Sequence, residues 1–153
     1  MAIYLVQHGK SLSKEVDPEK GLSEEGRKEV ERVASAAKKY GLNVASIKHS
    51  GKKRARQTAE IFESFLNPRD GVREVSGLGP LDDVASVAET LDPGENIMFV
   101  GHLPFMGKLV SYLISGSAER PALKFQNGGI VCLEKDPESG AWVIKTMLMP
   151  DIV

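Results

Sequence analysis

The three histidines of the chain are the residues best suited to carry chemistry. Each stands at the end of a short apolar segment that is typical of a buried strand; these segments are 2–8, 43–49 and, just before His102, 96–101. In α/β sheets, ligands bind beyond the carboxyl ends of the strands. A single histidine there is usually a capping or surface residue, but three of them beside the basic segment 52–54 indicate an anion-binding site.

The residue types around these histidines favour phosphoryl transfer. The chain lacks the His-x-x-x-His and His-Glu-x-x-His spacings of zinc sites and has no glycine-rich phosphate loop. It also has no Gly-x-Ser-x-Gly nucleophile turn. A neutral imidazole can attack phosphorus to form a covalent phosphohistidine, while an arginine and a second histidine hold the phosphoryl oxygens. We therefore expect phosphoryl chemistry without a metal ion or a cofactor.

Four segments resemble signature blocks of one family, the histidine phosphatase (phosphoglycerate mutase-like) superfamily. Leu5–Gly9 is similar to its Arg-His-Gly block, and Val100–Pro104 to its Gly-His-x-Pro block. Leu22–Arg27 looks like the segment that opens the family's first helix, and Ser50–Ala59 like its Ser-x-x-x-Arg-Ala-x-Gln-Thr-Ala block. The short chain, without an inserted helical subdomain, is most similar to the small SixA-type phosphohistidine phosphatases.

The resemblance implies a role for each matching residue. His8 would be the nucleophile, Arg54 would bind the phosphoryl oxygens, and His102 would be the second catalytic histidine. Gly9 would let the main chain approach the phosphate, because it has no Cβ. The implied reaction removes a phosphoryl group from a phosphohistidine, for example on a signalling protein, by transfer to His8 and then to water. The alternative enzyme is a small-molecule phosphomonoesterase that acts, for example, on a sugar phosphate.

Two positions near the nucleophile depart from the family pattern. Gln7 stands where the family has arginine, and an amide can donate hydrogen bonds but brings no charge. A non-catalytic module that only binds phosphate is therefore a further alternative. Lys10 is either a solvated loop residue or a cation that restores the missing charge at the substrate.

Four more residues each keep two interpretations. Ser50 hydrogen-bonds the phosphate, caps the helix that follows, or does both. His49 lies either at the rim of the site or partly buried at the strand end. Asp82 and Asp83 are candidates for the proton donor to the leaving group, or they cap the helix that they precede.

The elements that must position these residues alternate along the chain. Apolar periodicity and end signals predict helices over 23–40, 52–66 and 104–114 and one from Asp82 to Leu91. Strands are expected at 2–8, 43–49, 71–75 and 96–101, and a closing antiparallel pair at 123–134 and 141–149 with a turn at 136–140. This order predicts an α/β three-layer sandwich of the phosphoglycerate mutase-like class. It has a mostly parallel central sheet, helices on both faces and a C-terminal hairpin.

Composition excludes several classes of protein. The 153 residues carry a net charge of −1, which gives no case for a nucleic-acid binder, and 41% are hydrophobic, as in globular domains. Cys132, the single cysteine, excludes an internal disulfide and a cysteine-rich zinc site. The chain has no apolar run of membrane-spanning length, and the N-terminal residues lack a signal-peptide pattern. We expect one domain over residues 1–153 in a soluble, cytoplasmic protein without a membrane partner.

Overall fold

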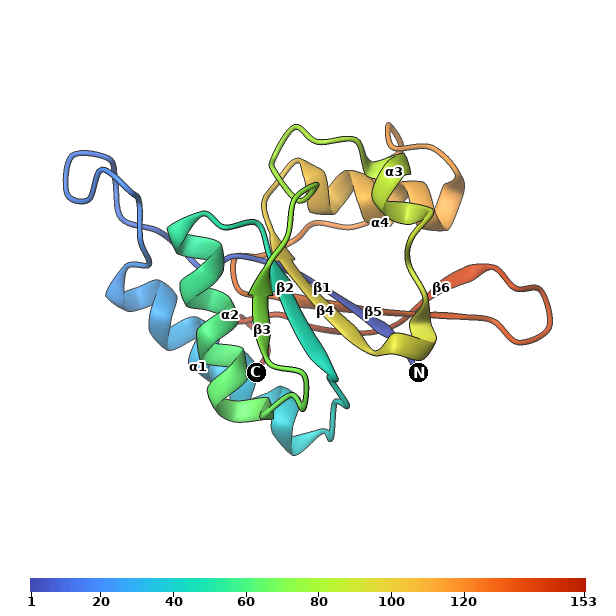
Figure 1. Ribbon diagram of the computed structural model, residues 1–153, viewed down its shortest axis with the longest axis horizontal. Helices are drawn as coiled ribbons and strands as arrows, with labels where there is room; N and C mark the ends of the chain where they lie inside the picture. The colour runs from blue at the N-terminus through green and yellow to red at the C-terminus, as the bar shows by residue number, and fades with distance from the viewer.

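A six-stranded mixed sheet forms the centre of the molecule in the computed structural model, which describes residues 1–153 (Figure 1). The strands lie in the order β3-β2-β4-β1-β5-β6. Their bounds are β1 (Ile3–Gln7), β2 (Ser46–His49), β3 (Val72–Glu74), β4 (Ile97–Gly101), β5 (Ile130–Lys135) and β6 (Trp142–Leu148). The four strands from β3 to β1 are parallel, and β5 and β6 are antiparallel. The predicted fold class, including the C-terminal hairpin, is confirmed.

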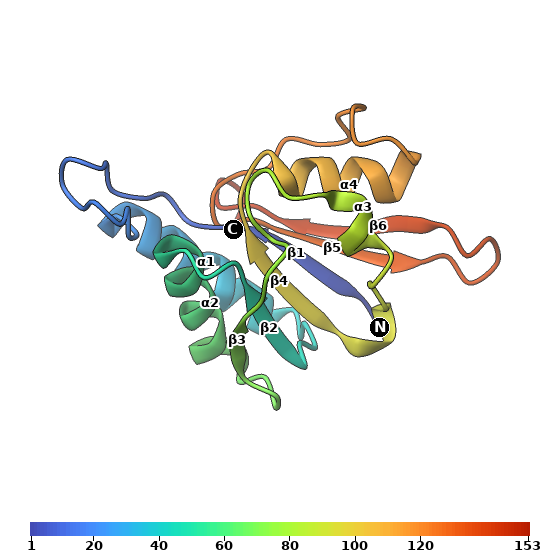
Figure 2. The same cartoon turned by 45° about the horizontal axis from the view of Figure 1, so that its top comes forward.

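Helices cover both faces of the sheet. Helices α1 (Glu24–Lys39) and α2 (Lys53–Leu66) lie on one face, while α3 (Val84–Ala88) and α4 (Phe105–Ser115) lie on the other (Figures 1 and 2). Successive side chains of a strand point to opposite faces, so Tyr4 and Val6 join the core under α1 and α2, and Ile3 and Leu5 join the core under α3 and α4. None of these helices combines the length and apolarity needed to cross a membrane.

Strand register brings the ends of β1, β2 and β4 to one edge. Gln7 lies opposite Gly101 on β4, and His49 lies opposite Val100. The three strands are neighbours in the parallel part of the sheet, so the residues that follow them meet at its carboxyl edge. The expectation that all three histidines gather there is confirmed.

The predicted helix over 23–40 is confirmed, and local chemistry explains its limits. Ser23 caps α1 by accepting the Gly26 N–H, and the acidic first turn and basic last turn suit the helix dipole. Helix α2 likewise begins and ends within one residue of its expected bounds. Helix α4 runs from Phe105 to Ser115, with Pro104 at the N-cap.

Three predicted elements are too long. Strand β2 begins only at Ser46, and β5 begins at Ile130, because residues 123–129 form an irregular connection and a turn before the strand. The helix predicted from Asp82 to Leu91 is reduced to the five residues of α3, with Asp83 as its cap. A 3₁₀ turn, η1 (Pro93–Glu95), follows it. The apolar residues of these segments have the expected spacing, but only part of each segment forms the backbone hydrogen bonds of a strand or helix.

Candidate active site

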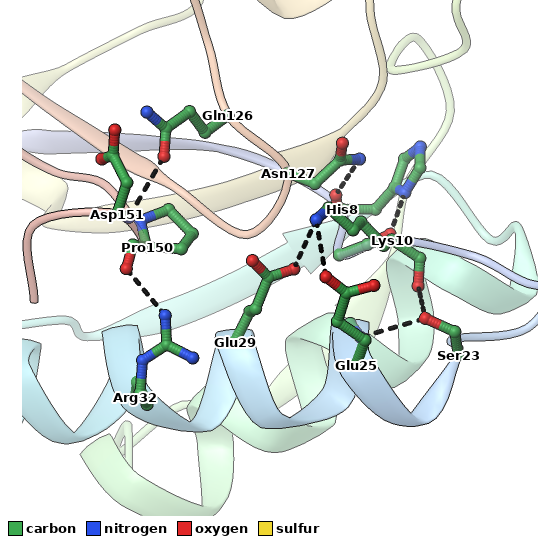
Figure 3. A network of polar contacts seen from close by, with 12 residues as sticks. His8, Lys10, Ser23, Glu25, Glu29, Arg32, Gln126, Asn127, Pro150 and Asp151 are labelled. Atoms are coloured by element: carbon green, nitrogen blue, oxygen red, sulfur yellow. Dashed lines mark hydrogen bonds and ion pairs between the residues drawn. The ribbon is translucent and has the colours of Figure 1, made fainter.

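Two of the histidines face each other at the carboxyl edge of the sheet. The ring centroids of His8 and His102 are 5.0 Å apart. The main chain of His8 is held by three contacts: its N–H donates to Gly101 O (2.9 Å), and its carbonyl accepts from Asn127 Nδ2 (3.0 Å, Figure 3) and the Gly128 N–H (3.2 Å). These bonds fix the nucleophile candidate relative to the neighbouring strand.

The His8 ring has a defined tautomer. Nδ1 lies 2.7 Å from Gly9 O, and because a carbonyl only accepts, Nδ1 carries the proton (Figure 3). Nε2 therefore keeps its lone pair, and the Nε–H of Arg54, in the first turn of α2, donates to it at 3.3 Å. Arg54 has no carboxylate partner, so its guanidinium is free to bind an anion at the reactive nitrogen.

The electrostatics of the site keep His8 neutral. Burial lowers the pKa of His8 from its ordinary value to about 4, and the charges of Arg54 and Lys20 act in the same direction against the bond to Gly9 O, which raises it. Above that pH the ring is an uncharged nucleophile. The dipole of α2 places partial positive charge at its N-terminus, which favours an anion there. No acidic residue in the first turn of α2 opposes this charge.

His102 is paired with Ser50. Its side chain is buried, and Nε2 lies 2.6 Å from Ser50 Oγ, while Nδ1 is buried without a partner. Burial, together with the charges of His8, Arg54 and Lys52, lowers the pKa of His102 to about 3. Ser50 Oγ also accepts the Lys52 N–H at 3.4 Å, but Lys52 is the N-cap of α2 and no side chain caps that helix, so the interpretation of Ser50 as the helix cap is wrong. Its hydrogen bond to the phosphate stays a prediction.

Gly9 has a different structural reason from the one implied by the resemblance. A Cβ there would lie 2.7 Å from Val30 and 3.1 Å from Leu22, so the missing side chain makes room for the start of α1. The Gly9 N–H donates to Thr58 Oγ1 at 3.0 Å, and that hydroxyl donates to Arg54 O at 2.7 Å. Thr58, which the sequence analysis assigned no role, thus ties the nucleophile segment to α2.

Gln7 lies beside the site as the last residue of β1. Its side chain is buried, and its Oε1 has no hydrogen-bond partner. Its position next to the nucleophile agrees with the sequence prediction. The charge of the family's arginine has no substitute at this position.

The structure does not bring the Lys10 ammonium group to the phosphate position. Its Nζ lies 2.9 Å from Glu25 and 3.4 Å from Glu29, both on α1 (Figure 3). Two carboxylates raise the pKa of Lys10 and neutralise its charge. These ion pairs favour the interpretation of Lys10 as a loop residue over that of a cation that replaces the missing arginine charge.

Lys20, to which the sequence assigns no role, is a loop cation whose charge is the smallest of the causes that shift the His8 pKa. It is near enough to His8 for its charge to lower the pKa of that ring. Its loop is attached to α2 by the ion pair of Lys53 with Asp17 (2.9 Å) and by the Leu22 N–H, which donates to Gln57 at 2.7 Å. No sequence signal distinguishes Lys20 from the other loop lysines, because these contacts join residues about 35 positions apart.

Asp82 and Asp83 have local structural roles. Asp82 accepts the Gly79 N–H at 2.7 Å, and Asp83 accepts the Ala85 N–H and the Ser86 hydroxyl at the start of α3. The Ser86 hydroxyl and then the Ala85 N–H lower the pKa of Asp83, which favours its ionised form, and that form has no proton to donate. The structure therefore supports their interpretation as turn and capping residues.

The site contains no cluster of metal ligands and lies outside the main surface cavities. No group of three or more His, Cys, Asp or Glu side chains has the arrangement of a metal site. The five main surface cavities, with volumes from about 380 to about 700 Å³, are lined by neither His8, Arg54 nor His102. The three side chains therefore lie outside the main cavities, at the carboxyl edge of the sheet.

The family model and the fold identify the protein as a phosphatase. Residues 3–78 match the family model of the histidine phosphatase superfamily (branch 1), and the chain belongs to this superfamily. No curated protein sequence matches the chain significantly.

Solved structures share the fold over nearly the whole chain. The protein histidine phosphatase SixA, solved in complex with tungstate, is 24% identical with a TM-score of 0.82, over 99% of this chain and 98% of that chain. A mycobacterial glucosyl-3-phosphoglycerate phosphatase is 18% identical (TM-score 0.72; 95% and 97% covered). A phosphoserine phosphatase from Entamoeba histolytica, in complex with 3-phosphoglyceric acid, is 15% identical (TM-score 0.69; 96% and 96% covered).

Proposed function

We propose that this protein is a protein phosphohistidine phosphatase. The observation that carries the proposal is that none of the main surface cavities is lined by His8, Arg54 or His102. The His8 and His102 rings lie at the sheet edge, outside the main cavities of the surface. A small metabolite is usually bound in a pocket that buries most of its surface, whereas a phosphorylated side chain is presented by its own protein. The SixA structure, which matches nearly end to end, is that of a protein histidine phosphatase.

The reaction proceeds in two in-line displacements. Nε2 of His8 attacks phosphorus, the bond from phosphorus to the substrate nitrogen breaks, and the substrate imidazole leaves with that electron pair. The bond from Nδ1 to Gly9 O (2.7 Å) stabilises the positive charge that develops on the His8 ring. Water then attacks phosphorus, which restores neutral His8 and releases inorganic phosphate.

Four groups stabilise the transferring phosphoryl oxygens in this proposal. Arg54 moves its donor from His8 Nε2 to a phosphoryl oxygen, and Ser50 and His102 act on the other side of the site. Lys20 supplies the positive charge that Gln7 lacks. Because the charge in the transition state is spread over the equatorial oxygens, such preorganised donors account for most of the rate acceleration.

The leaving group explains why no strong general acid is needed. A phosphohistidine imidazole leaves readily, so the hydrogen-bonded carboxylates of Asp82 and Asp83 are not required as proton donors. A phosphate ester of a sugar alcohol has a poor leaving group and would need one. This difference favours the phosphohistidine substrate over the small-molecule alternative, although two similar structures are small-molecule phosphatases by name.

A substrate panel tests the proposal. A phosphohistidine protein, a chromogenic phosphate ester and several sugar phosphates would be compared by kcat/KM, with and without EDTA. We expect the highest value for the phosphohistidine protein and no effect of the chelator. A sugar phosphate that is turned over faster would support the small-molecule alternative. Phosphate binding without turnover of any substrate would support a binding module.

A further inference from the structure

The turn after β2 connects His49 to the catalytic pair. His49 is the last residue of β2 and is buried. Its Nδ1 accepts the N–H of Gly51 at 3.0 Å, which closes a tight turn around Ser50. Ser50 Oγ is in turn 2.6 Å from Nε2 of His102. A continuous set of contacts therefore links a histidine with no catalytic assignment to the second catalytic histidine.

The turn has little freedom to adopt another shape. Gly51 has φ +94°, a conformation that side chains disfavour, and a Cβ there would lie 2.6 Å from the Glu74 carboxylate. Glu74 lies beside His49 on β3, opposite it in register. The Glu74 carboxylate thus packs against the backbone at Gly51, and the Gly51 N–H has His49 Nδ1 as its acceptor.

We infer that His49 is a positioning residue: by holding the Gly51 N–H, it places the Ser50 hydroxyl on the His102 imidazole. The inference rests on the proposed role of His102 in phosphoryl transfer. Without the Nδ1 acceptor the Gly51 N–H loses its partner, and the turn can relax. Ser50 and His102 would then be less well ordered when the phosphoryl group arrives.

The contact requires an uncharged His49 ring. Burial lowers the pKa of His49; the charges that face it are Glu74 on β3 and Glu60 on α2, which raise the pKa, and Arg56 on α2, which lowers it. Protonation of Nδ1 would direct one N–H against another and break the turn. Ser50 is therefore held in place only when His49 is neutral.

Two substitutions of similar polarity test the contact. In His49→Asn, Oδ1 takes the place of Nδ1 and can accept the N–H two residues on, as in an Asx turn. In His49→Gln, the amide is one atom further out and cannot. We expect His49→Asn to retain kcat within about threefold and His49→Gln to lower kcat about fivefold to thirtyfold, with little change in KM. Equal losses in both variants would overturn the inference.

A double-mutant cycle and a spectrum separate positioning from general damage. If His49 acts through Ser50, His49→Gln should lower kcat no further in a Ser50→Ala background. The ¹⁵N and ¹H shifts of the His102 ring, recorded without substrate, should change alike in His49→Gln and Ser50→Ala and stay unchanged in His49→Asn. Additive losses, or a His102 ring unaffected by His49→Gln, would contradict the inference. The spectra decide this even if no substrate of the panel is turned over.

Discussion

The two segments that follow β1 are placed in the structure by different forces. Residues 7–9 are held by main-chain bonds to Gly101 and Gly128 and by the tie from Gly9 to Thr58. Residues 10–22 form a loop that extends away from the sheet (Figure 1) and is closed by main-chain bonds of its own, such as Leu12 N–H to Gly21 O. Side chains attach it to the helices: Lys10 to α1, and Asp17 to Lys53 of α2. The first segment sets the position of the nucleophile, and the second sets the charge around it.

This difference shows how one site can lose a signature residue. The Gln7 position belongs to the rigid segment, where no shift of the backbone can bring another cation into place. The loop is attached to the helices by one exposed ion pair, Lys10 with Glu25, and by one partly buried pair, Lys53 with Asp17. Of its two lysines near the ends, Lys10 is neutralised by α1, and Lys20 acts on His8.

The largest effect is expected at the rigid segment. His8→Ala should lower kcat at least about a thousandfold, because the covalent pathway is lost. The variant should keep its fold, since the main-chain bonds of residue 8 do not need the imidazole. Rapid quench into alkaline denaturant, where phosphohistidine survives, should show labelled phosphate on the parent and none on the variant. Label on another residue of the parent would show that the reactive segment is elsewhere.

The next largest effect separates the two lysines of the loop. Lys20→Ala should lower kcat/KM about tenfold to a hundredfold, as expected for the loss of a charged donor to the phosphoryl group. Lys10→Ala, the matched control, should stay within about threefold of the parent, because its charge is already neutralised.

A double-mutant comparison tests whether Lys20 and the residue at position 7 serve the same phosphoryl group. In a Gln7→Arg background, Lys20→Ala should cost less, because the arginine supplies the same charge. Equal losses for Lys10→Ala and Lys20→Ala would remove the distinction between the two parts of the loop.

A titration of His8 compares the same lysines without substrate. With a pKa of about 4, about 90% of the ring is neutral at pH 5, where an unperturbed ring would be almost fully charged. Activity should therefore persist to lower pH than an ordinary histidine allows. Removing a nearby positive charge raises a histidine pKa, so NMR titration should show a higher His8 pKa in Lys20→Ala and an unchanged one in Lys10→Ala. A parent value near 6.5 would contradict the burial argument.

The smallest effect concerns the attachment of the loop. Asp17→Asn weakens the ion pair with Lys53, whose distance is 2.9 Å, and the amide should still accept the Gly21 N–H. We expect KM to rise about twofold to fivefold with kcat nearly unchanged, because the pair is only partly buried and the contact with Gly21 is kept. The effect should shrink at high salt. A large loss of kcat would show that the loop is as critical as the strand end.

The sequence alone predicted the layers, the helix over 23–40 and the meeting of three histidines at one edge. These features depend on local caps, on apolar periodicity and on the rule that parallel strands present their carboxyl ends together. The three histidines and the basic segment 52–54 could be placed at this edge for the same reason, whereas the roles of His8, Arg54 and His102 came from the resemblance to the histidine phosphatase family. The strand predicted over 123–134 begins only at Ile130 in the structure. Apolar spacing does not show which residues pair with a neighbouring strand, so it overestimated the length of this element.

Only the tertiary structure decided what surrounds those residues. Lys10 and Lys20 are equivalent in the sequence, but Lys10 is paired with two carboxylates of α1, whereas the charge of Lys20 contributes to the lowered pKa of His8. Gly9 makes room for Val30, and His49 holds the Gly51 turn beneath Glu74. Strand and helix patterns arise from interactions between near neighbours in the chain. The charges and contacts of the site join residues far apart in the chain, and no local pattern specifies them.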